Sequence, residues 1–146
     1  MLPQKLNARY VDARNDRLRP VMIHHAVLGS IERFIAMLLE HYEGRLPLWL
    51  APDQVVVASV TAASAGYARE VCGALSAAGF RVVADVREER VARKAAEARD
   101  AGIPVFIAVG EAEIRNNTVA VRRPDGKQDV MSLHAVVERL KPEALK

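Results

Sequence analysis

The heptapeptide Gln54–Val60, which reads Q-V-V-V-A-S-V, is the stretch of sequence that decides the fold class. It is mostly valine and shows no regular alternation of apolar and polar residues. Such a run is typical of a strand that is covered on both faces, as in the centre of a parallel sheet. We therefore predict a buried central strand here, with helices on both sides of its sheet.

Beyond this strand, segments typical of helices alternate with segments typical of strands. A helix at 67–78 places Val71 and Leu75 on one face. Further strands are expected at 80–86, 104–110 and 118–123, and further helices at 88–101 and 132–140. Pro124-Asp125-Gly126 predicts a turn after the last of these strands. The alternation predicts an α/β fold with a mostly parallel sheet between two helix layers.

The segment Arg19–Phe34, R-P-V-M-I-H-H-A-V-L-G-S-I-E-R-F, precedes this alternating region. Its part Val21–Leu28 predicts a buried strand, and Ser30 predicts the N-cap of a helix that ends near Gly44. The buried face expected for this helix consists of Ile31, Phe34, Ile35 and Leu38. Arg33 places a cation in the first turn, which opposes the helix dipole. It is therefore either a solvated or salt-bridged arginine or a functional one.

The composition is that of an ordinary globular protein, with 146 residues, 51% hydrophobic and 27% charged. The net charge of +3 permits contact with nucleic acid without requiring it. A single cysteine, Cys72, excludes an internal disulfide and a cysteine-rich zinc site. Because there is no long apolar run and no N-terminal leader pattern, we expect a cytoplasmic protein without a membrane partner.

The run from Val21 to Phe34, with His24, Gly29-Ser30 and Glu32-Arg33, resembles motif 3 of threonyl-tRNA synthetases, which are class II aminoacyl-tRNA ligases. The resemblance continues through 48–52 and 54–57 into the anticodon-binding domain of that family. It implies a three-layer α/β/α domain with a mixed five-stranded sheet, preceded by a strand-helix remnant of the catalytic domain. We accordingly expect the remnant at 1–45, a connector containing Trp49 at 46–53 and the anticodon-binding domain at 54–146.

The resemblance also implies roles for two residues of the remnant. Arg33 matches the motif 3 arginine that contacts ATP, and His24 matches one of three protein ligands of a zinc ion that selects threonine. Motifs 1 and 2 and the other zinc ligands are expected upstream of Met1. ATP and zinc therefore belong to the full-length family. We expect no cofactor in the isolated chain and no aminoacylation by it alone.

RNA recognition is the chemistry that the rest of the resemblance implies. Glu113 and Arg122 match a glutamate and an arginine that read anticodon bases, an acceptor and a forked donor. The family stretch D-L-R-N-E-K appears as D-V-R-E-E-R at 85–90, which retains Arg87 but replaces a base-reading asparagine by Glu88. An ionised glutamate accepts hydrogen bonds but cannot donate them. Arg123 and Lys127 are suited to phosphate contact.

Two hypotheses from different classes follow. In the first, the chain binds the anticodon stem-loop of a threonine tRNA and no DNA. In the second, it is an interaction or regulatory protein that has lost specific tRNA reading, as Glu88 and the family's glycine and arginine replaced by Ala92 and Ala96 suggest. It would then form a homodimer through its motif 3 remnant or bind a missing catalytic domain. A third hypothesis, a small enzyme on a flavodoxin-like sheet, has no motif in its favour.

Overall fold

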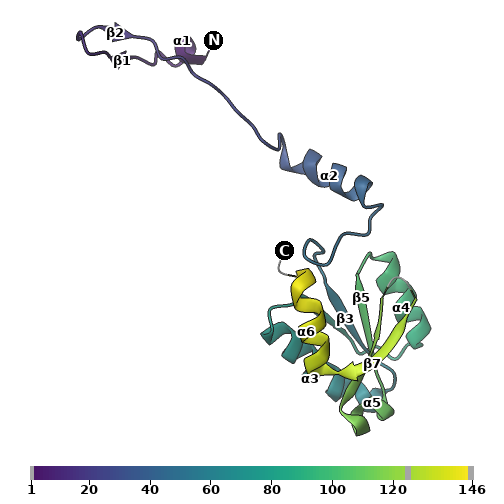
Figure 1. Ribbon diagram of the computed structural model, residues 1–146. Coiled ribbons are helices and arrows are strands. Elements are labelled where there is room, and N and C mark those ends of the chain that lie inside the picture. The colour runs from purple at the N-terminus through teal and green to yellow at the C-terminus, as the bar shows by residue number, and fades with distance from the viewer. Residues whose placement is uncertain (1, 124–125, 145–146) are drawn as a thin grey trace. The chain divides into compact units, whose positions relative to one another are not determined.

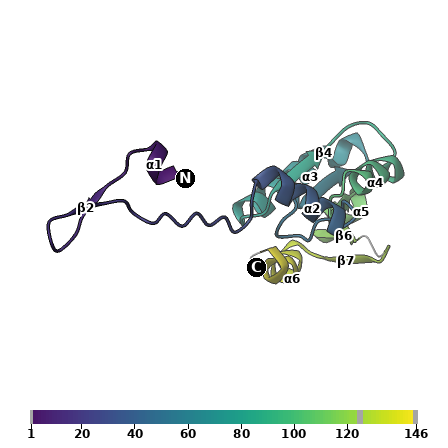
Figure 2. The same ribbon diagram turned by 90° about the horizontal axis from the view of Figure 1, so that it is seen from above.

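Five strands form one mixed sheet in the order β4-β3-β5-β6-β7. The computed structural model describes residues 2–123 and 126–144, and the sheet strands are β3 (Val55–Ser59), β4 (Val82–Asp85), β5 (Val105–Val109), β6 (Thr118–Arg122) and β7 (Gln128–Ser132). β3 pairs in parallel with β4 and β5, whereas β6 runs antiparallel to both β5 and β7. All strands except β6 therefore run in one direction, and Figure 2 shows β4 and β7 at opposite edges.

Helices cover both faces of this sheet (Figure 1). α3 (Ala65–Ala77) and α6 (Leu133–Ala144) pack on one face, and α4 (Val91–Asp100) packs on the other. Strand β3 shows why, because Val55 and Val57 join the core beneath α3 and α6 while Val56 and Ala58 join the core beneath α4. Every residue of β3 is buried. The three-layer fold with a central covered strand is thus confirmed.

The predicted strands and helices of this region are confirmed with small shifts of their ends. The 3-10 turn η1 (Ala62–Ser64) and the helix α5 (Glu111–Asn116) are additional elements that the sequence pattern did not predict. The sequence pattern does not predict β7, which corresponds to the fifth strand that the family resemblance implies. Of the predicted turn Pro124-Asp125-Gly126, the first two residues lie outside the described residues, and Gly126 has a positive φ of 79°.

The connector before β3 is fixed to the sheet by hydrogen bonds. The buried side chain of Gln54 donates from Nε2 to the Leu48 carbonyl and accepts from the Arg81 backbone N–H, both at 2.9 Å. The Arg81 guanidinium donates to connector carbonyls at Trp49, Ala51 and Pro52. Leu48 and Ala51 are the buried apolar residues of the connector, whereas Trp49 is 42% exposed. The aromatic packing that was expected there is therefore only partial.

The N-terminal part contains α1 (Leu2–Lys5) and a two-stranded antiparallel ladder of β1 (Tyr10–Val11) and β2 (Arg17–Leu18). The strand predicted over 21–28 is not formed, and this segment is exposed throughout. Val21, Ile23 and Val27 are 91%, 88% and 82% exposed. A strand requires a neighbour for its backbone groups and its apolar side chains, and within the described residues no strand pairs with this segment.

Helix α2 (Ile31–His41) forms as predicted, with Ser30 Oγ accepting the Arg33 backbone N–H at 3.3 Å. Gly44 follows it with a φ of 75° and donates its N–H to the Leu39 carbonyl at 2.8 Å. The expected burial of its apolar face is wrong for this structure, because α2 has no buried residue. Ile31 remains 65% exposed.

The chain divides into the compact units Met1–Ile35 and Ala36–Lys146. The boundaries predicted at 45 and 54 stay predictions. Among the described residues, no helix is long and apolar enough to cross a membrane.

Candidate nucleic-acid interface

A hollow of about 280 Å³ lies between the start of α4 and strands β5, β6 and β7, and we call it the reading hollow. The alternation of side chains along β6 explains which of its residues line the hollow. Val119 and Val121 point into the core beneath α3 and α6. The alternate residues of β6, Ala120 and Arg122, therefore face the other side of the sheet and line the hollow. The hollow is lined by Val60, Val91, Phe106, Ala108, Glu113, Ala120, Arg122 and Gln128.

Glu113 and Arg122, predicted as a pair from the sequence, both line the reading hollow. Arg122 lies opposite Gln128 in the β6–β7 register, and its Nη2 donates to Gln128 Oε1 at 2.9 Å. Glu113 lies in α5, where its Oε2 accepts the Gly110 backbone N–H at 2.9 Å. The hollow therefore combines an apolar lining of alanine, valine and Phe106 with an anionic acceptor contributed by α5 and a cationic donor contributed by β6.

A second hollow, of about 310 Å³, adjoins the first and shares Phe106 and Arg122 with it. Ala92 and Ala96 of α4 line it, so the two alanines that depart from the family pattern leave open space beside Arg122. Arg123 also lines it, but its guanidinium is bonded to the Glu143 carboxylate at 3.0–3.1 Å. The phosphate contact predicted for Arg123 would compete with this ion pair.

Arg87 and Glu88, the other two residues predicted to contact the anticodon, do not line the reading hollow. Arg87 lines a different one, with Asp85, Lys94 and Glu97. Its Nε and Nη2 donate to the two Asp85 carboxylate oxygens at 3.0 and 2.7 Å, and Nη2 also donates to Glu97 at 2.6 Å. Glu88 is exposed in the bend between β4 and α4.

These contacts shift the acidity of the groups involved. The Arg87 hydrogen bonds hold the pKa of Asp85 below its ordinary value, and the charge of Lys94 adds to this effect. The pKa of Arg87 is raised, first by Asp85 and then by Glu97. The pKa of Glu97 is lowered by Arg87 and Arg93. Asp85, Arg87 and Glu97 are therefore charged at neutral pH.

Sequence reasoning missed Gln128, which supplies an amide to the reading hollow. The signal that would find it is hairpin register, because pairing 118–122 with 128–132 places residue 128 opposite residue 122. Sequence reasoning also missed the buried cation Lys94, which is 1% exposed. Its position on α4, one helical turn after Arg90, gives no sign of burial.

The motif 3 residues lie in the N-terminal part of the chain. His24 and Arg33 are both exposed, His24 in the segment without secondary structure and Arg33 in the first turn of α2. Within residues 2–123 and 126–144, no group of three histidine, cysteine or acidic residues is placed to hold a metal ion. Zinc sites in proteins take three or four protein ligands, so the described residues do not fit the zinc site that the resemblance implies.

Cys72 fits an inert core thiol and not a nucleophile. It is half-buried against the core, and burial raises the pKa of its thiol. A reactive cysteine requires the opposite shift.

Comparison with known proteins gives consistent results. Residues 54–143 match the family described as the anticodon binding domain. The chain is 46% identical over 145 residues to the threonine–tRNA ligase of Gluconobacter oxydans (strain 621H), covering 99% of this chain and 22% of that protein. It is 48% identical over 145 residues to the threonine–tRNA ligase of Xylella fastidiosa (strain 9a5c), covering 98% of this chain and 23% of that protein.

Among solved structures, the chain is similar to the RNA binding domain of threonyl-tRNA synthetase from Cryptosporidium parvum Iowa II. The TM-score is 0.79 at 32% sequence identity, and the match covers 99% of this chain and 37% of that one. The chain thus spans only 22–23% of the length of the two ligases.

Proposed function

The chain belongs to the anticodon-binding domain family, with threonyl-tRNA synthetases as its relatives, and from this premise we propose that it binds the anticodon stem-loop of a threonine tRNA. Protein modules that read RNA sequence bind unstacked loop bases by their edges, from side chains on a rigid platform. The partner proposed is therefore a single-stranded loop and not a duplex.

One observation carries this proposal: Glu113 and Arg122 line the same hollow. They come from two elements, α5 and β6, that border the antiparallel side of the sheet. A carboxylate accepts from base amino and imino groups, and a guanidinium donates to base carbonyl and ring-nitrogen acceptors. The apolar lining of the hollow suits the face of a base. Arg122 reads one base edge, and Gln128 holds its guanidinium in place.

We further propose that aminoacylation requires more of the family's protein than this chain supplies. Its described residues offer one arginine for ATP and one histidine for zinc, and such a reaction depends on positioning two substrates together. ATP and zinc are accordingly assigned to the full-length ligase and not to the anticodon-binding region. We also propose a cytoplasmic location, an N-terminal remnant over 1–45 and an RNA-binding domain over 54–146.

The experiment that tests the proposal is a titration of a labelled threonine anticodon stem-loop with wild type, Arg122→Ala and Arg139→Ala. Arg139 is the matched control, because it is also an exposed arginine but lies on α6 in an ion pair with Asp129. We expect Arg122→Ala to lose about tenfold or more in affinity and Arg139→Ala to stay within about twofold. Equal behaviour of the two variants would reject base reading by Arg122.

A second candidate function is self-association through the N-terminal segment and α2. Val21, Ile23 and Val27 are each more than 80% exposed, and Ile31 adds to the apolar surface on α2. An exposed apolar surface of this kind is typical of an interaction site. A second copy of the chain is the occupant that we propose for it under this alternative.

A further inference from the structure

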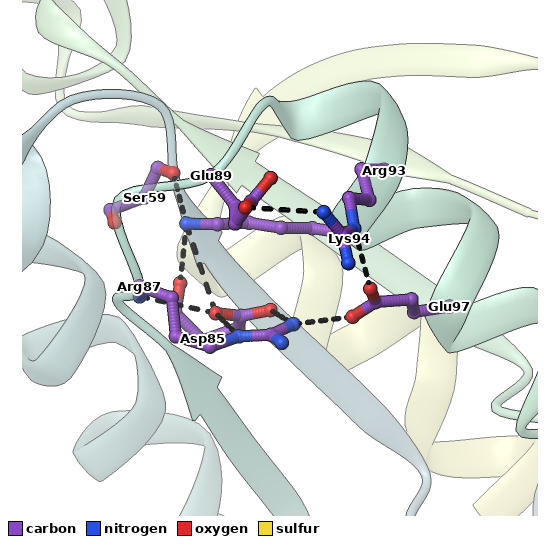
Figure 3. A network of polar contacts seen from close by, with 7 residues as sticks. All are labelled: Ser59, Asp85, Arg87, Glu89, Arg93, Lys94 and Glu97. Atoms are coloured by element: carbon purple, nitrogen blue, oxygen red, sulfur yellow. Dashed lines mark hydrogen bonds and ion pairs between the residues drawn. The ribbon is translucent and has the colours of Figure 1, made fainter.

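Lys94 is a fully buried lysine, and its ammonium group connects two strand ends (Figure 3). Its Nζ donates to the carbonyl of Ser59 at 2.9 Å and to the carbonyl of Asp85 at 3.2 Å. These are the last residues of β3 and β4, which are neighbouring parallel strands. The same ammonium lies 3.8 Å from the Asp85 carboxylate. The Lys94 ammonium therefore fixes the position of Asp85, the last residue of β4, relative to the end of β3.

The Asp85 carboxylate extends this arrangement into the following bend. It accepts the backbone N–H of Arg87 at 3.2 Å and both arms of the Arg87 guanidinium. Arg87 Nη2 reaches Glu97 on α4 at 2.6 Å, and Arg93 on α4 bonds Glu97 at 3.0 Å and Glu89 at 3.3 Å. We call this set the α4 clamp; its members are Asp85, Arg87, Glu89, Arg93, Lys94 and Glu97 (Figure 3).

The clamp holds both sequence neighbours of Glu88. Arg87 is bonded to Glu97 and Glu89 is bonded to Arg93, so each side of residue 88 is connected to α4. Among the described residues, Glu88 has no hydrogen bond or ion pair of its own, and its side chain is exposed. The ion pairs thus fix residues 87 and 89, while the side chain of Glu88 stays exposed and available for an RNA contact.

Position 88 lies at the end of the sheet from which Glu113 lines the reading hollow. β4 and β5 both run parallel to β3, so their carboxyl ends lie at the same end of the sheet, on either side of β3. Glu88 follows β4 there, and Glu113 follows β5. Val91, three residues after Glu88, lines the reading hollow with Glu113. Because β3 lies between β4 and β5, their carboxyl ends are two strand spacings, or about 10 Å, apart. One loop of RNA spans that distance and could contact both positions.

The charges of the clamp argue against a direct RNA contact by Arg87. Three carboxylates and three cations balance within it, and the Arg87 guanidinium already has two carboxylate partners. A phosphate would have to displace one of them. These ion pairs favour a structural role for Arg87 over the direct anticodon contact that the resemblance implies.

We propose that Arg87 is a positioning residue for RNA reading: through Asp85, Glu97 and the buried Lys94 it fixes the bend so that the side chain at position 88 faces the RNA. This inference rests on the proposed function, because it requires an RNA loop at the carboxyl ends of β4 and β5. Base reading at position 88 is what the family resemblance implies, and the new element is its dependence on Arg87. Glutamate at this position accepts from a base amino group and repels phosphate. An asparagine at position 88 would both donate and accept hydrogen bonds without carrying a charge.

The test is a double-mutant cycle on the 146-residue chain with a labelled threonine anticodon stem-loop. Glu88→Asn is expected to raise affinity about tenfold, because it removes a negative charge and adds a donor. In the Arg87→Ala background the same substitution is expected to change affinity less than about twofold. Arg90→Ala is the matched control, since Arg90 is an exposed arginine in the same bend outside the clamp. It should preserve the gain from Glu88→Asn.

Two further variants separate positioning from charge. Arg87→Lys keeps the charge but loses the bidentate geometry, and Glu97→Ala removes the α4 anchor. Both variants should reduce the affinity gain from Glu88→Asn, as Arg87→Ala does. Neither should change the slope of log affinity against log salt concentration. Loss of a direct phosphate contact would instead lower that slope by about 1. NMR amide signals of residues 86–90 should shift in both variants while those of β3 stay in place, which also shows that the variants are folded.

The outcomes separate the two proposals. If wild type shows no preference for the cognate stem-loop and Arg122→Ala changes nothing, the proposed function fails and this inference fails with it. If Arg122→Ala weakens binding but Glu88→Asn gives the same gain with and without Arg87, only the positioning role is overturned. Absence of any gain from Glu88→Asn in an RNA-binding chain would overturn it as well.

Discussion

At the scale of single residues, the buried ammonium of Lys94 is the least expected feature of the structure. A buried charge loses its hydration, and this cost is offset only if partners replace the water. Lys94 has two carbonyls and a carboxylate within reach. The arrangement suggests that this lysine holds the ends of β3 and β4 in place, where a leucine would only fill space.

Lys94→Met, which removes the donor but keeps much of the volume, should therefore destabilise the chain by about 2–4 kcal/mol. Urea denaturation at neutral pH measures the change, and the denaturation slope should stay constant. Lys141→Met on α6 is the control, because Lys141 is exposed and its loss should cost less than about 0.5 kcal/mol. A Lys94→Met chain as stable as wild type would show that the buried cation adds no net stability.

Asp85 predicts a pH dependence of stability. Its folded-state pKa is lowered by Arg87 and Lys94 from an ordinary value of 3.8. The folded state therefore binds this proton less readily than the unfolded state. The resulting stabilisation is fully present above about pH 4 to 5 and is lost as pH falls through the folded pKa.

Asp85→Asn should accordingly reduce stability at pH 7 and have a smaller effect at pH 3. Urea titrations of both proteins at pH 7, 5, 4 and 3 give this comparison directly. A difference in stability that stays constant from pH 7 to pH 3 would mean that the carboxylate charge is not what stabilises the bend.

At the scale of elements, α5 combines a structural and a proposed functional role in Glu113. Its carboxylate accepts the N–H of Gly110 at the start of this six-residue helix. Glu113→Ala should cost about 1 kcal/mol through the lost cap. Glu113→Gln keeps an oxygen that can accept this N–H, so its stability should stay within about 0.5 kcal/mol of wild type.

Both variants should lose about tenfold in stem-loop affinity if the carboxylate reads a base. Thermal unfolding and RNA titration of the same two proteins separate the roles. A Glu113→Gln chain that binds RNA like wild type would restrict Glu113 to capping α5.

Prediction from sequence succeeded for elements that are buried by other helices and strands of this chain. The run 54–60 is apolar on both faces, and β3 is covered on both faces. It did not detect α5, because six residues are too few for a helical period to show. It was wrong over 21–28, where an apolar pattern predicted a strand but no partner strand lies beside it in the described residues.

The candidate site was predictable only in part. Glu113 and Arg122 were paired from resemblance, and the fold places both on one hollow. That Arg87 is bonded to Glu97, ten residues later, depends on how α4 packs on the sheet. No local sequence pattern contains that information, so the ion pair of Arg87 with α4 could not be predicted. The anticodon contact of Arg87 stays a prediction.

At the scale of the whole molecule, the exposed N-terminal apolar residues predict concentration-dependent self-association. Ile23→Lys combined with Ile31→Lys should shift sedimentation velocity profiles towards monomer, because both side chains are more than 60% exposed and their loss removes no buried contact. The substitution Val130→Lys is the control, since Val130 is also 61% exposed but lies on β7. Wild type that stays monomeric at high concentration would eliminate this alternative.

We infer that this anticodon-binding domain reads the anticodon of a threonine tRNA through its reading hollow. The most direct measurement is titration of wild type and Arg122→Ala with a threonine anticodon stem-loop and with the same stem-loop carrying a different anticodon, each at two salt concentrations. We expect a preference for the threonine anticodon that persists at the higher salt concentration and is lost in Arg122→Ala. Equal binding of both stem-loops, falling steeply with salt in both proteins, would contradict it and leave only non-specific phosphate attraction.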